Sequence, residues 1–403
     1  MTGITLKNGG KWLGVTLLIG IGSGSLSAFF LTSLSVVTKV REANSWLILF
    51  LPVAGLIVTW LYIRFGGEAC HGNNLVIDQA NGGSESVPWQ MMPLTLFGTI
   101  SSHLFGGSVG REGTAVQMGG VVAEYVGKLW QITKADRYLL MMCGISGGFS
   151  SVFGTPLAGT VFSLEVLAIG KLSTKGLVPS LMTALIANHV TTLWGVRHTR
   201  YEMGVVPDTT FRLIFLICLF AIIFGLVSRL FSRSIVWLKE IYLIFIPNPL
   251  WRVVVGSVMI LILVAFFQTS RYLGLSLPLL TDAFNGQQQT FDFINKLVFT
   301  VFSLGAGFQG GEVTPLFEIG ATLGSSLAQM TALPIGFVAA LGFVGVFSGA
   351  TNTPLACFVM GIELFGSGGA VWFLVVCVIS FLFSGQEGIY SAQLKDDKVT
   401  NLL

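Results

Sequence analysis

Long apolar segments follow one another along most of the chain and predict membrane-spanning helices. Four of them, residues 12–37, 45–63, 211–237 and 253–272, contain few or no charged side chains. A helix needs about 20 consecutive, mostly apolar residues to cross the hydrocarbon core of a bilayer. Each of these segments is therefore long enough to span a membrane.

Other apolar segments are too short to cross a bilayer cleanly, and they are bounded by Gly, Pro, Ser and Asn. They cover residues 114–130, 157–169, 315–330 and 355–365. Helices that end at membrane depth are tolerated only where their ends are enclosed by protein or line a cavity. In transporters, such broken helices indicate the binding site. The pattern predicts an all-α, polytopic membrane protein with short, broken helices around an enclosed site.

The composition agrees with a chain that is surrounded mainly by lipid. Hydrophobic residues make up 53% of the 403 residues and charged residues only 10%, whereas soluble domains carry about 25% charged residues. The net charge of +3 is small, and no basic run indicates a nucleic-acid partner. The five cysteines and four histidines show no metal-ligand spacing. We therefore expect no metal and no cofactor.

The first half of the chain resembles the second. Residues 154–158 (Gly-Thr-Pro-Leu-Ala) recur as residues 352–356 (Asn-Thr-Pro-Leu-Ala), and a glutamate follows each copy at the same offset, at Glu165 and Glu363. Further matches pair residues 149–150 with 347–348, and residues 110–114 with 310–314. The pattern predicts one transmembrane domain over residues 1–403, built from repeats at about 12–195 and 211–394. Transporter repeats are often inverted, with the site at their interface, and we adopt that hypothesis.

The strongest chemical motif is residues 107–114 (Gly-Ser-Val-Gly-Arg-Glu-Gly-Thr), which places Glu112 between glycines where an apolar helix begins. A charged side chain inside a membrane is costly unless it is paired or solvated. A helix N-terminus supplies unpaired N–H donors and a partial positive charge, and it also binds free anions. Glu112 can thus act as a tethered anion that competes with a mobile one. The alternative is a glutamate that caps its own helix.

Residues 310–315 (Gly-Gly-Glu-Val-Thr-Pro) form a second glycine-rich helix start that carries a carboxylate. A proline such as Pro315 is favoured in the first turn of a helix. Glu312 is either a second proton or anion relay site or a stabiliser of that helix's dipole. Glu318 lies six residues further on. It is either a relay residue or a cytoplasmic or interhelical partner.

Two weaker motifs offer neutral hydrogen-bond donors. The amides of Asn73 and Asn74 follow Gly72 and precede a short apolar run; they can donate to an anion, but Asn is also a good helix N-cap. Tyr390 lies near the end of the last apolar segment. Its hydroxyl can donate to an anion, although Tyr near a membrane edge is more often an interfacial anchor.

Together, and in this order, these motifs resemble those of the CLC family of chloride channels and chloride/proton antiporters. Residues 110–114 resemble the family's Gly-Arg-Glu-Gly-Pro box, with Thr114 in place of proline, and residues 311–315 its Gly-x-Phe-x-Pro box, with Val313 in place of phenylalanine. Residues 155–159 match its Pro-Leu-Ala-Gly stretch, and residues 389–392 its C-terminal tyrosine motif. The resemblance covers residues from about 12 to 394.

Two departures from the family pattern refine the expectation. Where the family has the serine that contacts chloride, this chain has Asn73 and Asn74, and this form resembles the fluoride-exporting CLC-F branch. Where the antiporters have an inner proton-transfer glutamate, this chain has Val166. Its loss often accompanies channel function in the family, but the CLC-F branch shares it and is associated with antiport. Glu312, matched by sequence to Glu112 in the other repeat, is then expected to reach the same central site and replace that acid.

The resemblance implies a fluoride/proton antiporter of the bacterial inner membrane, a homodimer with one pathway per subunit and no cytoplasmic regulatory domain. The alternative is a chloride/proton antiporter or chloride channel. No nucleophile–base pair or metal set accompanies Glu112, so we expect no enzyme, and intramembrane carboxylates argue against a purely structural protein. Glu112 is expected to be the gate and proton acceptor. The residues expected to bind the anion are Gly72, Asn73, Asn74, Gly110, Arg111, Gly113, Gly311, Val313, Thr314 and Tyr390.

Overall fold

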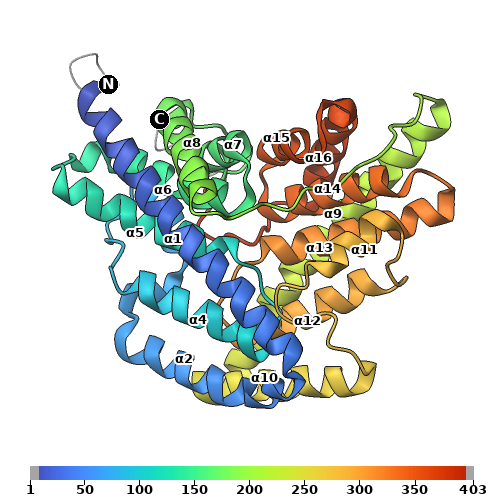
Figure 1. The fold of residues 1–403 in the computed structure, drawn as a ribbon, viewed down its shortest axis with the longest axis horizontal. Coiled ribbons are helices and arrows are strands. Elements are labelled where there is room, and N and C mark those ends of the chain that lie inside the picture. Colours follow the sequence, from blue (N-terminus) through green and yellow to red (C-terminus); the bar gives the residue numbers. More distant parts are fainter. Residues whose placement is uncertain (1–8, 396–403) are drawn as a thin grey trace.

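The computed structural model describes residues 9–395, and this part of the chain forms sixteen α-helices and no β-strand. The all-α expectation is confirmed. Figure 1 shows the helices arranged around a central region that the C-terminal segment enters. The helices are α1 (Gly9–Ala43), α2 (Leu51–Phe65), α3 (Asn73–Ala80), α4 (Met91–Phe105), α5 (Glu112–Leu129), α6 (Arg137–Phe153), α7 (Pro156–Glu165), α8 (Leu177–Leu193), α9 (Phe211–Phe245), α10 (Pro249–Phe267), α11 (Pro278–Asn285), α12 (Asp292–Ala306), α13 (Val313–Thr331), α14 (Ile335–Thr351), α15 (Pro354–Phe365) and α16 (Ala370–Ser384).

Within the described residues, six helical segments are long and apolar enough to cross a membrane. Many of the others are much shorter. Helix α7 has 10 residues and α15 has 12, so at about 1.5 Å per residue neither crosses a hydrocarbon core of about 30 Å. The multi-pass architecture with short, broken helices is therefore as predicted. The six segments are Gly9–Ala43, Ser45–Phe65, Thr174–Leu193, Phe211–Phe245, Pro249–Phe267 and Ser367–Ser384.

Glycines allow the helices around the centre to pack in close pairs. A Cβ atom on Gly119 of α5 would overlap the carbonyl of Gly144 on α6, and one on Gly320 of α13 would overlap that of Gly342 on α14. Small residues let helices in membranes approach until their backbones touch. The four glycines hold α5 against α6 in one half and α13 against α14 in the other.

Contacts between the halves join positions that match in sequence. Phe149 of α6 stacks on Phe347 of α14, with ring centroids 6.2 Å apart and an interplanar angle of 14°. In Figure 1 the blue-to-green half lies mainly on the left and the orange-to-red half mainly on the right. These pairings support the two-repeat hypothesis; the repeat boundaries stay a prediction.

The two glutamates that the sequence comparison singled out cap each other's helices. Glu165, at the end of α7, accepts hydrogen bonds from the N–H groups of Leu355 (3.0 Å) and Ala356 (2.8 Å) at the start of α15. Glu363, near the end of α15, accepts from Leu157 (2.9 Å) and Ala158 (2.7 Å) at the start of α7. This reciprocity requires α7 and α15 to run antiparallel, and it satisfies N–H groups that lipid could not.

Candidate functional site

The site forms where the glycine-rich loops before α5 and α13 meet. Gly110 and Gly311 make an antiparallel bridge, in which each N–H donates to the other's carbonyl, at 2.6 Å and 2.9 Å. A Cβ atom on Gly311 would overlap the Glu112 carboxylate, so the position requires glycine. Residues about 200 positions apart in the sequence thus share one backbone contact.

The bridge also fixes which residues of the two loops correspond. Helix α5 begins at Glu112, two residues after Gly110, and α13 begins at Val313, two residues after Gly311. Glu112 therefore matches Val313, and Glu312 matches the N-cap residue Arg111. The expected equivalence of Glu112 and Glu312 is wrong by one residue, because identical letters were matched whereas hydrogen bonds set the register.

Glu112 sits on the N-terminus of the opposite helix. One carboxylate oxygen accepts from the N–H of Val313 (2.6 Å), and the other from the N–H and hydroxyl of Thr314 (3.3 and 3.0 Å) and the N–H of Arg111 (3.0 Å). The side chain is 1% exposed. The α13 end supplies positive partial charge and charge-assisted bonds. The alternative, in which Glu112 caps its own helix, does not describe this arrangement.

Glu312 is the N-cap residue of α13, but its side chain makes no capping hydrogen bond. Its carboxylate interacts electrostatically with Lys239 of α9 and with Glu112. It is therefore in the same region as Glu112, although the two residues are not equivalent. Val166, at the position of the family's missing acid, is buried at the C-terminal end of α7.

The two asparagines differ in their surroundings. The side-chain oxygen of Asn74 accepts from the N–H of Ala392 at 3.1 Å, so Asn74 holds the segment that carries Tyr390. The side-chain oxygen of Asn73 is buried without a partner, and its nitrogen would lie 2.7 Å from a Cβ placed on Gly113. Neither caps α3, whose N-cap is Gly72 with φ of +56°. Only Asn73 points a free amide toward the start of α5.

Sequence reasoning missed a second amide, Gln117 of α5. It is 6% exposed, its side-chain oxygen has no partner, and its side-chain nitrogen would lie 3.4 Å from a Cβ on Gly72. Buried polar groups are nearly always hydrogen-bonded, so an unpaired one indicates a missing partner. The available signal was that Gln117 is the one amide side chain in the apolar segment 114–130.

Tyr390 approaches the site from the C-terminal segment. It is 7% exposed, and its ring meets the edge of Phe162 at a centroid distance of 6.2 Å. Its hydroxyl interacts electrostatically with Glu312 and Glu112. The alternative of an interfacial anchor is wrong because the side chain is buried. A cavity of about 700 Å³ adjoins Tyr390, and Arg233 and Lys395 also line it.

Arg111 lies between two further cavities. It lines one of about 240 Å³ together with Lys39, and one of about 40 Å³ together with His198 and Thr314. Among the described residues, no carboxylate forms an ion pair with its guanidinium, and its Nε atom is buried without a partner. Arg111 thus places a positive charge near Thr314, and this charge interacts electrostatically with Glu112 and Glu318 without a direct ion pair.

Helix N-termini that meet around a buried carboxylate in a multi-pass membrane protein define the class of intramembrane anion transporters. The chain belongs to the voltage-gated chloride channel (CLC) family, whose sequence pattern matches residues 54–385. It is 44% identical to a chloride/fluoride channel protein of Pseudomonas syringae pv. tomato, over 95% of this chain and 86% of the relative. It is 25% identical to the H⁺/Cl⁻ exchange transporter ClcA of Vibrio cholerae, over 94% and 88%.

Solved structures agree with this assignment. A CLC-type fluoride/proton antiporter superposes with a TM-score of 0.94 at 36% identity, covering 97% of this chain and all of that one. A slow cyanobacterial Cl⁻/H⁺ antiporter superposes with a TM-score of 0.80 at 18% identity, covering 94% and 96%. The second match shows the shared fold alone.

Proposed function

We propose that the protein exchanges fluoride for protons and exports fluoride across the bacterial inner membrane. The observation that carries this proposal is the position of the Glu112 carboxylate on the N-terminus of α13. A helix N-terminus binds free anions through the same donors. The carboxylate therefore occupies a place that a mobile anion can take when the side chain leaves.

Protonation couples the two ions. A neutral Glu112 loses most of its attraction for the N–H groups of Val313 and Thr314, since charge-assisted hydrogen bonds are about twice as strong as neutral ones. The side chain then leaves, and an anion replaces it at the end of α13. Return of the carboxylate expels the anion and requires release of the proton. One proton thus moves for each exchange of the side chain with an anion.

The donors around this place favour a small, strongly hydrated anion. Fluoride gives up its water only where strong donors replace it, and the backbone N–H groups, the Thr314 hydroxyl and the side-chain NH₂ group of Asn73, which lies beside Gly113, are such donors. Gly72, Gly110 and Gly113 leave room for the anion to approach the backbone, and Tyr390 contributes a hydroxyl. Asn74 acts indirectly, because it holds the Tyr390 segment. Two similar proteins have names that include fluoride.

Glu312 carries protons between Glu112 and the opposite side of the membrane. Val166 cannot titrate, whereas Glu312 interacts electrostatically with Glu112 and Tyr390. Each subunit of a homodimer holds its own pathway, because all of these residues come from one chain.

Flux measurements in proteoliposomes test the function. Purified protein is reconstituted, and fluoride and chloride efflux are followed with electrodes at two pH values, with proton movement recorded beside them. We expect fluoride efflux well above chloride efflux, with proton movement in the opposite direction. In Glu112→Gln the proton movement should disappear, since an amide does not titrate.

The runner-up function is a chloride/proton antiporter or a chloride channel, which Val166 favours. Equal fluoride and chloride flux would overturn the fluoride assignment. Anion flux with no proton movement in the unmodified protein would instead indicate a channel.

A further inference from the structure

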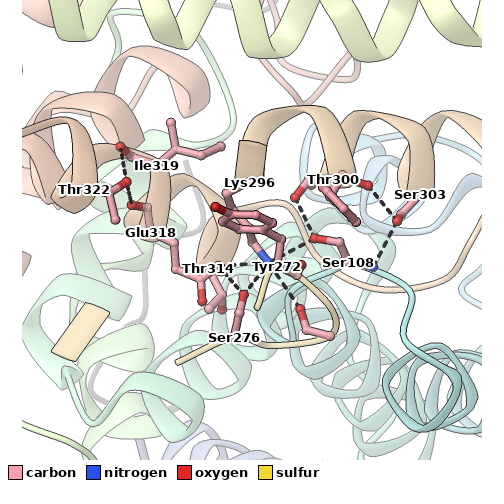
Figure 2. A network of polar contacts seen from close by, with 12 residues as sticks. Ser108, Tyr272, Ser276, Lys296, Thr300, Ser303, Thr314, Glu318, Ile319 and Thr322 are labelled. Carbon is pink, nitrogen blue, oxygen red and sulfur yellow. Dashed lines mark hydrogen bonds and ion pairs between the residues drawn. The ribbon is translucent and has the colours of Figure 1, made fainter. Parts of the chain in front are cut away.

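A buried lysine lies beside the loop that carries Glu112. The ammonium group of Lys296, on α12, donates to the hydroxyls of Ser276 (2.6 Å) and Ser108 (3.0 Å) and pairs with the carboxylate of Glu318 (3.0 Å). It also lies near two backbone carbonyls. The Lys296 and Glu318 side chains are fully buried, and Figure 2 shows Lys296 between Glu318 on one side and Ser108 on the other. Glu318 is thus an interhelical partner, one of the roles considered for it.

The ion pair is not explained by stability alone. Charges at membrane depth are expensive and usually functional. Replacing a buried ion pair by apolar residues of similar volume is often neutral or stabilising. An apolar contact between α12 and α13 would hold the helices together equally well. The presence of two buried charges here therefore needs a reason other than stability.

The lysine of the ion pair also binds Ser108, which lies four residues before Glu112. Three residues of α12, spaced so that they share one face, bind it. The Ser108 hydroxyl accepts a hydrogen bond from the Lys296 ammonium group and contacts the hydroxyl of Thr300 at 3.0 Å. The Ser108 N–H donates to the hydroxyl of Ser303 at 2.9 Å. Figure 2 shows Ser108 facing these side chains. The loop start is therefore fixed on α12.

The other end of the pair is fixed on the helix that receives the gate. Glu318 belongs to α13, and the same helix begins at Val313, whose N–H binds Glu112 at 2.6 Å. One ammonium group thus joins the loop that carries the carboxylate to the helix that accepts it. We propose that Lys296 is a positioning residue for transport, which sets the distance between the Glu112 loop and the N-terminus of α13. This inference rests on the proposed function.

The corresponding helix of the other half has no such charge. The bridge between Gly110 and Gly311 places Thr95 of α4 where α12 has Lys296, and Thr99 where it has Thr300. The hydroxyl of Thr114 lies 3.4 Å from that of Thr95 and 2.6 Å from that of Thr99, so both threonines make neutral contacts. The ion pair therefore exists in one half alone, the half whose helix end receives the gate carboxylate.

Two single substitutions separate positioning from general support. Ser108→Ala removes the hydroxyl contacts of the gate loop with Lys296 and Thr300, keeps the N–H bond to Ser303 and leaves the ion pair intact. Ser276→Ala removes a hydroxyl that contacts both Lys296 (2.6 Å) and Glu318 (3.1 Å) but leaves Ser108 and the gate loop unchanged, so it is the control for loss of one serine hydroxyl from the network. We expect Ser108→Ala to lower fluoride-driven proton movement roughly tenfold and to raise uncoupled fluoride leak, because small displacements of a reacting group have large kinetic effects. Ser276→Ala should retain coupling. Equal coupling in both variants would overturn the inference.

A double variant keeps the test decisive if single loss of Lys296 prevents folding. Lys296→Met with Glu318→Leu removes both charges together, so no unpaired charge is buried. We expect a folded protein with unchanged thermal stability but a lowered ratio of protons to fluoride. A normal ratio in this folded variant would show that the pair is structural only. Absence of coupled exchange in the unmodified protein would instead refute the proposed function itself.

Discussion

At the scale of single residues, the carboxylates of Glu112 and Glu312 differ in the hydrogen-bond donors that they face. Glu112 makes four hydrogen bonds to the loop and to the start of α13, whereas Glu312 makes no capping bond there. The first carboxylate resembles a bound anion in its environment, whereas the second makes no capping hydrogen bond to that helix end. The two glutamates are therefore assigned different roles.

Replacement of Glu312 tests its role in proton movement. Glu312→Gln keeps the size of the side chain but cannot titrate. Because its side chain does not cap α13, we expect a folded protein that retains fluoride binding and loses coupled fluoride/proton exchange. Fluoride-driven proton movement in the purified variant measures this, with Glu202→Gln in the exposed loop before α9 as the control. Intact coupling in Glu312→Gln would mean that protons take another route.

Replacement of Gln117 tests the amide that sequence reasoning missed. Gln117→Leu preserves the volume and removes a buried, unpartnered oxygen, so thermal stability should stay the same or rise. If the amide donates to the transported anion, the ratio of fluoride to chloride efflux should fall by about tenfold, the effect of about 1.4 kcal/mol. An unchanged ratio would limit Gln117 to packing against Gly72.

The sequence indicated candidate residues for this site but not their contacts. Glycines around Glu112 at the start of an apolar helix identify it directly, because that pattern has a local physical meaning. Asn73 and Asn74 could not be told apart, since their difference depends on Ala392, far along the chain. Lys296 was not predicted for the same reason, because Ser108 and Glu318 lie on other elements.

At the scale of elements, the short helices α7 and α15 are stabilised because the N–H groups at the start of each have a partner. Helices α7 and α15 have only 10 and 12 residues and are too short to cross a bilayer, and lipid could not satisfy the N–H groups at their ends. Each receives a carboxylate from the end of the other. The recurrence of the two glutamates in the sequence therefore has a structural cause, although their partners could not be read from it.

Removal of one of these caps should destabilise the protein. Glu165 is 4% exposed, and Glu165→Ala leaves the N–H groups of Leu355 and the buried Ala356 at the start of α15 unpaired. We expect a loss of about 1–3 kcal/mol, the usual effect of an unsatisfied buried donor or a lost cap. Thermal unfolding in detergent measures it. Glu165→Gln, which keeps one acceptor oxygen, should lose less, and Glu363→Ala is the counterpart on α7. No change in Glu165→Ala would show that water satisfies these groups.

The boundaries of elements were less predictable than their existence. The long apolar segments and the short ones appear where length and composition placed them. The register between the halves was not predictable, because Gly310 and Gly311 offer two ways to match Gly110, and only the bridge of backbone hydrogen bonds selects one. Hydrogen bonds between distant segments leave no local pattern in a sequence.

At the scale of the whole molecule, a single chain supplies every part of the site. Glu112 comes from the first half, Val313 and Thr314 from the second, and Tyr390 from the C-terminal segment. The groups described around Glu112 therefore all belong to one chain. Two-fold symmetric dimers are the commonest homo-oligomers, and a dimer of this chain would hold two complete pathways.

This independence gives a quantitative expectation for mixed dimers. Light scattering of the protein in mild detergent should give the mass of a dimer. When subunits with Glu112→Gln are co-expressed with unmodified ones, coupled exchange should fall in linear proportion to the fraction of variant subunits, because each site is built from one chain. Separately purified and mixed dimers provide the control, since their exchange must also sum linearly. A monomer in several mild detergents would contradict dimerisation, and a steeper-than-linear decrease would show that the two pathways depend on each other.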